Sequence, residues 1–212
     1  MVRGVNDVIY APRYDSEVYP AAGTTILSFF TAAQNNGVTS APGASGVKTL
    51  SDTNMELGGQ LGKGNEFYCT GIEFLFFPGV QVGRGSVALA DVGLFADDVY
   101  TVLKSGIVTL TIGTDRTYIQ DGPLNIFPPC TRLAVAAAVG VTNDSDSTAA
   151  SVVEEVVYAA ASGEPYAITP VYIESSQTFK VTVQWPVAVA VPSTVAARLQ
   201  CRLRGYLIRN AQ

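Results

Sequence analysis

The chain has 212 residues, a formal net charge of −5 and no histidine. Apolar residues make up 48% of it and charged residues only 15%, whereas an average soluble domain is ~25% charged. Without histidine, the chain lacks the most common general base and the most common metal ligand. We therefore expect no enzyme, no metal site and no cofactor. The apolar excess favours contacts between subunits, because apolar residues beyond the capacity of one core need another surface to cover them.

The distribution of charged and apolar residues excludes further classes. Arg3 and Arg13 stand alone near the start of the chain, whereas proteins that condense nucleic acid directly usually carry a basic arm. We therefore expect no direct binding of nucleic acid. No stretch reaches the ~20 apolar residues of a transmembrane helix, and Met1–Tyr10 lacks the apolar centre of a signal peptide.

The first part of the chain predicts an arm, a strand, a long loop and a second strand. Residues 1–23 have little periodicity and contain two prolines, so we expect an extended N-terminal arm that needs a partner surface to become ordered. Thr24–Thr31 is rich in β-branched and aromatic residues and predicts a strand. Loops with many glycines fill 32–64. Phe67–Phe77 predicts a long strand that is apolar on both faces.

The middle of the chain contains the only predicted helix, at Ala96–Lys104. Asp97 and Asp98 lie in its expected first turn and a lysine in its last, which matches the helix dipole. The preceding Val80–Leu94 is rich in glycine and alanine, and its pattern predicts at most a short strand at Val87–Leu89.

Two hairpins and one single strand are predicted after the helix. In the first hairpin, Ile107–Ile112 and Arg116–Gln120 flank a glycine-containing turn. In the second, Arg132–Val139 and Ser151–Ala160 flank an exposed polar tip. A further strand is predicted at Ile168–Ile173.

The clearest strand patterns are the last two. Apolar and polar residues alternate in Thr178–Trp185 and again in Val195–Arg204, which places one set of side chains on a buried face. Trp185 falls on the apolar side of its strand. With about eight or nine strands and one short helix, the chain is predicted to be an all-β sandwich or barrel, with residues 24–212 as one domain.

The candidate contact residues form a row of arginines near the C-terminus. Arg198, Arg202 and Arg204 concentrate positive charge on one face of the last predicted strand, and Arg209 follows them. Either this row contacts the phosphates of lipid headgroups or nucleic acid, or an acidic neighbouring subunit, or it is an ordinary solvated strand face.

Other motifs do not indicate a catalytic or metal site. Glu154 and Glu155 are adjacent in a predicted strand and so point to opposite faces, which prevents them from forming one carboxylate dyad. The glycine stretch Gly58–Gly64 departs from the phosphate-loop spacing and precedes a strand instead of a helix. Asn143–Asp146 lacks the glycine and distal glutamate of a calcium loop.

The three cysteines, Cys69, Cys130 and Cys201, are far apart and form no C-x-x-C pair. Zinc ribbons and thioredoxin-like chemistry are therefore excluded. Cys69 and Cys201 lie in strand patterns, and we expect them to be small buried hydrophobic residues.

Three groups of residues resemble a known family. They are Asp52-Thr53-Asn54-Met55 with the glycine turn and the aromatic strand from Phe67; Lys104-Ser105-Gly106 leading to Tyr118, Pro123-Leu124 and Phe127-Pro128; and Gln177, Phe179 and Val181 before the final strand. Together they resemble the jelly-roll major capsid proteins of icosahedral bacteriophages with an internal membrane, the corticovirus- and tectivirus-like lineage. That family usually has two jelly rolls per chain, and this sequence has strands for one, so the resemblance is to a single jelly-roll version.

The resemblance implies a structural viral protein that self-assembles into an icosahedral virion shell over a membrane. Its implied partners are copies of itself in capsomers, other capsid proteins and a lipid membrane surface, and its implied location is the virion capsid. The alternative is a lectin-like or adhesin-like β-sandwich that binds glycans through its loops. Against this alternative, the only tryptophan is expected in the core, where it cannot stack on a sugar.

Overall fold

The structure is a computed structural model and describes residues 6–41, 45–79, 89–113, 116–127, 131–142, 151–162 and 166–210. These residues form eleven strands, one α-helix and one short 3₁₀ helix. In chain order the elements are β1 (Asn6–Tyr10), β2 (Arg13–Tyr19), β3 (Ile26–Phe29), β4 (Asn65–Phe77), α1 (Leu89–Leu103), β5 (Ile107–Ile112), β6 (Arg116–Pro123), the 3₁₀ helix (Leu124–Ile126), β7 (Thr131–Thr142), β8 (Ser151–Ser162), β9 (Tyr166–Ile173), β10 (Phe179–Gln184) and β11 (Ala197–Asn210).

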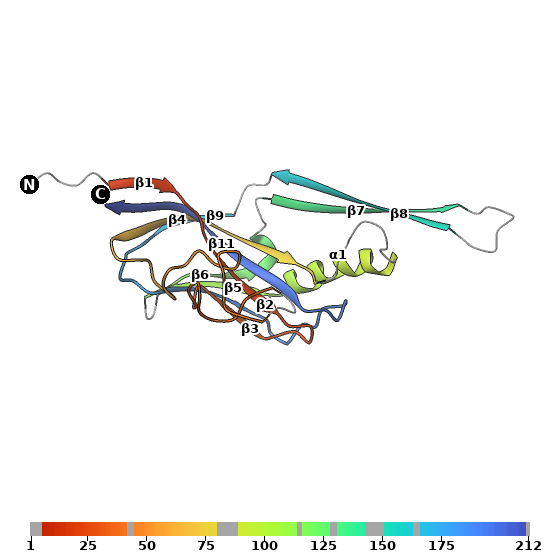
Figure 1. The fold of residues 1–212 in the computed structure, drawn as a ribbon, viewed down its shortest axis with the longest axis horizontal. Helices are drawn as coiled ribbons and strands as arrows, with labels where there is room; N and C mark the ends of the chain where they lie inside the picture. The colour runs from red at the N-terminus through yellow and green to blue at the C-terminus, as the bar shows by residue number, and fades with distance from the viewer. Residues whose placement is uncertain are drawn as a thin grey trace, which may run out of the picture.

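Nine of these strands form two antiparallel sheets that pack face to face (Figure 1). One sheet has the order β1-β11-β4-β9, with β2 also paired to β11, and the other has the order β3-β10-β5-β6. The last two strands of the chain, β10 and β11, therefore lie in opposite sheets. The prediction of an all-β sandwich with one helix is confirmed.

The strand pairing is that of a single jelly roll. The pairs β2–β11, β3–β10, β4–β9 and β5–β6 are all antiparallel and nested, as in a chain folded back on itself about its midpoint. The first and third pairs lie in the five-stranded sheet, and the second and fourth lie in the other sheet. This alternation of nested pairs between two sheets winds eight strands into the jelly roll.

The prediction of an extended N-terminal arm is wrong for residues 6–19. β1 pairs with β11 from Tyr10↔Tyr206 to Asn6↔Asn210, and β2 pairs with the earlier half of β11, up to Leu203. β11 has 14 residues, so one of its edges is long enough to hold both strands in succession. Local periodicity could not show this, because the partner of β1 and β2 lies at the other end of the chain.

The helix is longer than predicted, and its charges lie elsewhere. α1 begins at Leu89, so the short strand expected at its start is wrong for Leu89, and residues 87 and 88 lie outside the described residues. Asp97 and Asp98 consequently lie in the second half of α1, and Lys104 follows its last residue. The expected match to the helix dipole is therefore wrong. Asp98 is instead buried and accepts a 2.9 Å hydrogen bond from the backbone N–H of Ser193.

The core between the two sheets is aromatic. Phe74 of β4 makes edge-to-face contacts with Phe29 of β3 and with Phe127, at ring-centroid distances of 5.8 and 6.2 Å. Trp185, which directly follows β10, is 1% exposed, as its place on the apolar side of the predicted strand Thr178–Trp185 indicated, and its ring meets that of Tyr19 at 5.3 Å. Aromatic pairs of this geometry stabilise a core beyond the area that they bury.

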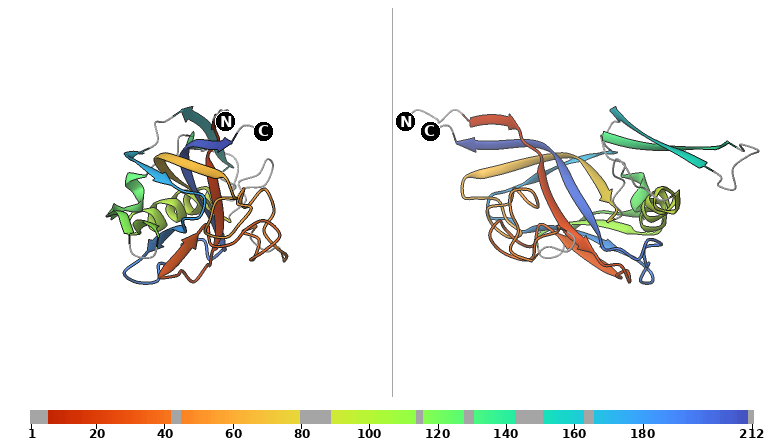
Figure 2. Two further views of the ribbon diagram at one scale, coloured as in Figure 1. Left: turned by 90° about the vertical axis from the view of Figure 1, so that its left-hand side faces the viewer. Right: turned by 45° about the vertical axis from the view of Figure 1, so that its right-hand side comes forward.

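The hairpin of β7 and β8 is confirmed and extends away from the sandwich (Figures 1 and 2). Its pairing runs from Thr131↔Ser162 at the base to Thr142↔Ser151 at the far end. Among the described residues, neither strand pairs with any other strand. The hairpin lies at the opposite end of the molecule from β1 and the end of β11. The polar tip was expected at Thr142–Ala150; Thr142 is instead the last residue of β7, and residues 143–150 lie outside the described residues.

Candidate functional site

Four tyrosines form one row across the outer face of the five-stranded sheet, the face away from the other sheet. Tyr10 of β1 pairs with Tyr206 of β11, Tyr206 pairs with Tyr68 of β4, and Tyr68 pairs with Tyr172 of β9. Directly paired residues project from the same face of a sheet. The neighbouring Cys69 is completely buried on the inner face, so this tyrosine row faces outward.

The members of the tyrosine row are accessible and held in place. Their exposed fractions run from 39% for Tyr68 to 51% for Tyr10. The rings of Tyr10 and Tyr206 meet edge to face at 5.7 Å. The hydroxyl of Tyr172 donates a hydrogen bond to Glu66, which is the main reason why the pKa of Tyr172 is raised to about 12. Tyr172 is therefore a neutral phenol at neutral pH.

Reasoning from the sequence missed this row. The four tyrosines lie in four strands that are far apart in the chain, and Tyr10 fell within the predicted arm. The one available signal was local: Tyr68 lies between two buried neighbours on its strand, Phe67 and Cys69. Only the register between strands shows that these separate outward positions line up.

Three of the four predicted arginines lie on the same face as this row. Arg198, Arg202 and Arg204 alternate with buried residues along β11, so they share the outer face, and we call them the arginine row. Arg209 lies an odd number of residues from Arg204 and therefore on the opposite face. It is half exposed and meets Asp7 of β1 at 3.6 Å. The structure thus brings three of the four predicted arginines together.

A buried carboxylate joins two members of the arginine row. Glu73 of β4 is completely buried, and its Oε1 lies 3.2 Å from Nη1 of Arg202 and 3.1 Å from Nε of Arg204. Arg204 also donates a 2.7 Å hydrogen bond to the hydroxyl of Tyr10. Burial alone would lower the pKa of Arg204, but its hydrogen bonds with Tyr10 and Glu73 outweigh burial and raise it.

Arg198 is held by different partners. Its Nη2 lies 3.0 Å from the hydroxyl of Ser16 and also donates to the backbone oxygen of Ser51. Its guanidinium lies over the ring of Phe77, 5.7 Å from the centroid, which is cation–π geometry. The arginine row is therefore held by hydrogen bonds and ion pairs to the sheet and to the neighbouring loop, and part of each guanidinium remains exposed.

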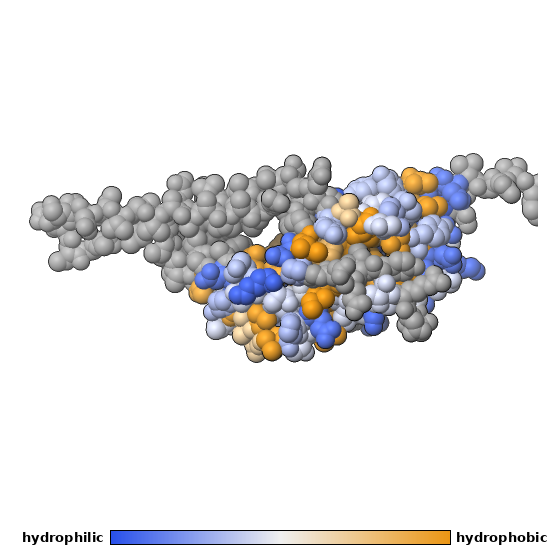
Figure 3. Space-filling view, turned by 180° about the vertical axis from the view of Figure 1, so that it is seen from behind, coloured by the Kyte–Doolittle hydropathy of each residue, from blue (hydrophilic) through white to orange (hydrophobic). Residues whose placement is uncertain are grey.

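The outer face as a whole joins aromatic and charged groups. Tyr10 links the tyrosine row to the arginine row through Arg204. Tyrosine and arginine are the residue types that protein interfaces favour at their centres. Figure 3, which views the molecule from behind, shows hydrophobic residues of the described body in several separate groups among hydrophilic ones.

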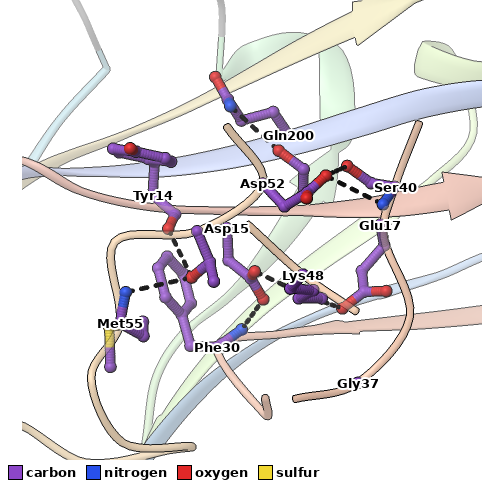
Figure 4. A network of polar contacts seen from close by, with 12 residues as sticks. Tyr14, Asp15, Glu17, Phe30, Gly37, Ser40, Lys48, Asp52, Met55 and Gln200 are labelled. Carbon is purple, nitrogen blue, oxygen red and sulfur yellow. Dashed lines mark hydrogen bonds and ion pairs between the residues drawn. The ribbon is translucent and has the colours of Figure 1, made fainter. Parts of the chain in front are cut away.

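A second charged group is buried beside β2 (Figure 4). Nζ of Lys48 lies 2.8 Å from Oδ1 of Asp15 and 2.5 Å from Oε1 of Glu17. Lys48 is 1% exposed and Asp15 is completely buried. Asp15 and Glu17 occupy alternate positions of β2, so they share its inner face. Lys48 reaches them from the long loop between β3 and β4. We call these three residues the lysine cluster.

Neighbouring residues of the same loop surround another buried carboxylate. Asp52 accepts hydrogen bonds from the backbone N–H groups of Ser40 and Thr49, at 3.0 and 2.8 Å, and from the hydroxyl groups of both residues. The loop that the sequence described only as glycine-rich is therefore organised around buried charges. The sequence signal was present but weak, because the lysine and the aspartate of such a loop are usually solvated.

The described residues contain no group of three or more cysteine, aspartate or glutamate side chains that could hold a metal ion. Cys69 and Cys201 are buried, as predicted, and burial raises the pKa of both thiols, that of Cys69 to about 12. Cys130 lies outside the described residues. Among the described helices, none is both long enough and apolar enough to cross a membrane.

Comparisons with protein-family models, with curated proteins and with solved structures found no match to this chain.

Proposed function

We propose that this chain is a structural subunit that self-assembles into an icosahedral virion shell. The jelly roll is one of the folds from which viral capsids are built. The sequence resemblance to single jelly-roll capsid proteins of membrane-containing bacteriophages points to the same role. The fold alone does not decide, because lectin domains also use it.

The observation that carries the proposal is the hairpin of β7 and β8. An isolated two-stranded hairpin is only marginally stable in water, and its unpaired edges invite pairing with another chain. This hairpin has 12 residues in each strand and extends beyond the sandwich. Its sequence is mostly alanine and valine. Such an element is stabilised by a neighbouring subunit, which a shell supplies.

The outer face of the five-stranded sheet supports the same proposal. The tyrosine row offers four exposed aromatic side chains in one line, and the arginine row lies beside it. The end of this sheet that holds β1 and the hairpin lie at opposite ends of the molecule (Figure 1), so one copy can contact two neighbours at once. In this proposal the partners are other copies of the chain and other capsid proteins, and a lipid surface is the further contact that the resemblance implies.

The test is the size of the purified protein, measured by light scattering together with negative-stain microscopy. We expect closed particles or regular oligomers. In a variant without the hairpin, Thr131 is joined to Ser162 by an Asn-Gly turn, because these residues are direct partners at the hairpin base. We expect this variant to remain folded, with its tryptophan buried, and to be monomeric.

Matched tyrosine variants test the outer face. Tyr206→Ser removes the centre of the tyrosine row, whereas Tyr100→Ser removes a tyrosine of α1 that is 69% exposed and lies outside the row. We expect the first to weaken assembly and the second to leave it unchanged. A wild-type protein that stays monomeric across concentration and salt would overturn the shell proposal.

A glycan-binding module is the second candidate, and the tyrosine row is the observation that favours it. Exposed aromatic rings beside charged groups can stack on sugars and bond their hydroxyl groups. In this candidate the tyrosine row, and not the buried Trp185, provides the rings that stack on the sugar. Glycan affinity of a monomeric sample, lost in Tyr68→Ser, would favour this candidate over the shell.

A further inference from the structure

The lysine cluster has no role in the surfaces described above, and its composition is unusual. A lysine is almost never fully buried unless it is paired, and here one buried ammonium meets two carboxylates. Asp15 is 0% exposed, and the side chain of Glu17 is 23% exposed. Three ions in one buried cluster are costly, because each loses its hydration.

Burial acts on the two carboxyl groups of the lysine cluster. It is the largest influence on the carboxyl groups of Asp15 and Glu17 and raises the pKa of both, against the opposing effect of Lys48. Transfer of one proton from the ammonium of Lys48 to Asp15 would leave a neutral amine in contact with a neutral carboxyl group. These two species are the reactants of amide formation.

The geometry also supplies the other parts of such a reaction. Nζ of Lys48 contacts Oδ1 of Asp15 at 2.8 Å, so the two groups that would react are already held together. The backbone N–H of Phe30 donates a 2.5 Å hydrogen bond to the other oxygen, Oδ2. A donor at this position stabilises the negative charge that develops on the oxygen during attack. Glu17 contacts the same Nζ at 2.5 Å and is placed to accept its proton.

We propose that Lys48 and Asp15 join in an intramolecular isopeptide bond, with Glu17 as the proton carrier. The lone pair of the neutral Nζ attacks Cγ of protonated Asp15, and a carbon–nitrogen bond forms. Glu17 takes a proton from Nζ and returns it to the departing hydroxyl group. The carbon–oxygen bond breaks and one water molecule leaves. No oxidant, metal or further reactant takes part.

The product suits its surroundings better than the ions do. The amide carbonyl can accept the hydrogen bond from Phe30, and the amide N–H can donate to Glu17, so two buried charges disappear without leaving an unsatisfied group. The bond would close a loop between positions that are 33 residues apart. A covalent link of this kind restricts the unfolded chain and ties the loop between β3 and β4 to β2. This inference does not depend on the proposed function.

The test is the intact mass of the folded wild-type protein, followed by sequencing of the protease fragments. We expect a mass lower than that of the sequence by one water molecule, and a branched fragment that joins residues 15 and 48. A folded protein with its full sequence mass overturns the proposal. A water loss that maps elsewhere, such as to Asp121-Gly122, also overturns it, because that dipeptide can cyclise by itself.

Variants distinguish this chemistry from other dehydrations. Asp15→Asn is expected to lose ammonia in place of water, because the leaving group changes while the new bond is the same. Lys48→Arg, which has no amine nucleophile, should keep its full mass. Glu17→Gln should stay folded, since Glu17 lies at the edge of the cluster, and should form the bond many times more slowly. A Glu17→Gln protein that is linked as fast as the wild type would remove Glu17 from the mechanism.

Discussion

Replacement of Asp52 by asparagine tests whether the buried carboxylates hold the long loop between β3 and β4 in place. Asp52 is completely buried, and Ser40 and Thr49 each donate to it through a backbone N–H and a hydroxyl group. Burial alone would raise the pKa of Asp52, but these hydrogen bonds outweigh burial and lower it from 3.8 to about 2. The folded state therefore prefers the charged carboxylate.

The size of the effect follows from this shift. A lowering from 3.8 to about 2 corresponds to roughly 2 kcal/mol of stability at neutral pH. In Asp52→Asn the side chain keeps one acceptor oxygen, but its NH₂ group meets the N–H donors of Ser40 or Thr49. We therefore expect the free energy of unfolding to fall by about 2 kcal/mol.

The pH dependence supplies a sharper test. Because the pKa of Asp52 is lower in the folded state, its contribution is fully present above pH 3.8 and is lost as the pH falls through about 2. At about pH 3 roughly half of it should remain. The difference between wild type and Asp52→Asn should therefore shrink as the pH is lowered from neutral.

The assay is urea unfolding of both proteins at several pH values. Asp7→Asn is the matched control, because Asp7 is half exposed and its pair with Arg209 at 3.6 Å is a surface contact that should contribute less than ~1 kcal/mol. A difference that stays constant across the pH range would refute the charged-acceptor argument. So would an Asp52→Asn protein as stable as the control.

Two substitutions test the core and the sheet. Trp185→Phe removes the 3.0 Å hydrogen bond from Nε1 to the backbone oxygen of Val102 and leaves a space beside Tyr19. We therefore expect the free energy of unfolding, measured by urea unfolding followed by circular dichroism, to fall by about 2–3 kcal/mol. A fall of less than ~1 kcal/mol would contradict the buried position of Trp185. Gly205→Ala places a Cβ 2.1 Å from the backbone oxygen of Tyr68, which no side-chain rotation relieves. We expect it to cost at least ~2 kcal/mol or to prevent folding, and wild-type stability would show that the pairing of β11 with β4 is wrong here.

Elements that depend on near neighbours were predictable from the sequence. Alternation located β10 and β11 and placed Trp185 on the core side, and turn chemistry located the β5–β6 and β7–β8 hairpins. Elements that depend on distant partners were not. β1 and β2 lack clear periodicity and become strands because β11 offers them an edge. The start of α1 was missed because Gly93 and its neighbours weaken the local helix signal.

The same distinction between near and distant partners applies to the candidate surfaces. The arginine row was predictable, because alternation along one strand places Arg198, Arg202 and Arg204 on one face. The ion pairs that Arg202 and Arg204 make with Glu73 were not predictable, since Glu73 belongs to β4 and meets β11 only through its register.

By itself, the sequence determined the absence of histidine and the class of the fold, since composition is read directly from the chain and alternation depends on residues close together in it. Tertiary structure alone decided which side chains meet. The tyrosine row joins positions from Tyr10 to Tyr206, and the lysine cluster joins β2 to a loop residue. Both depend on strand register and loop placement, where a shift of one residue would move every outward side chain to the opposite face.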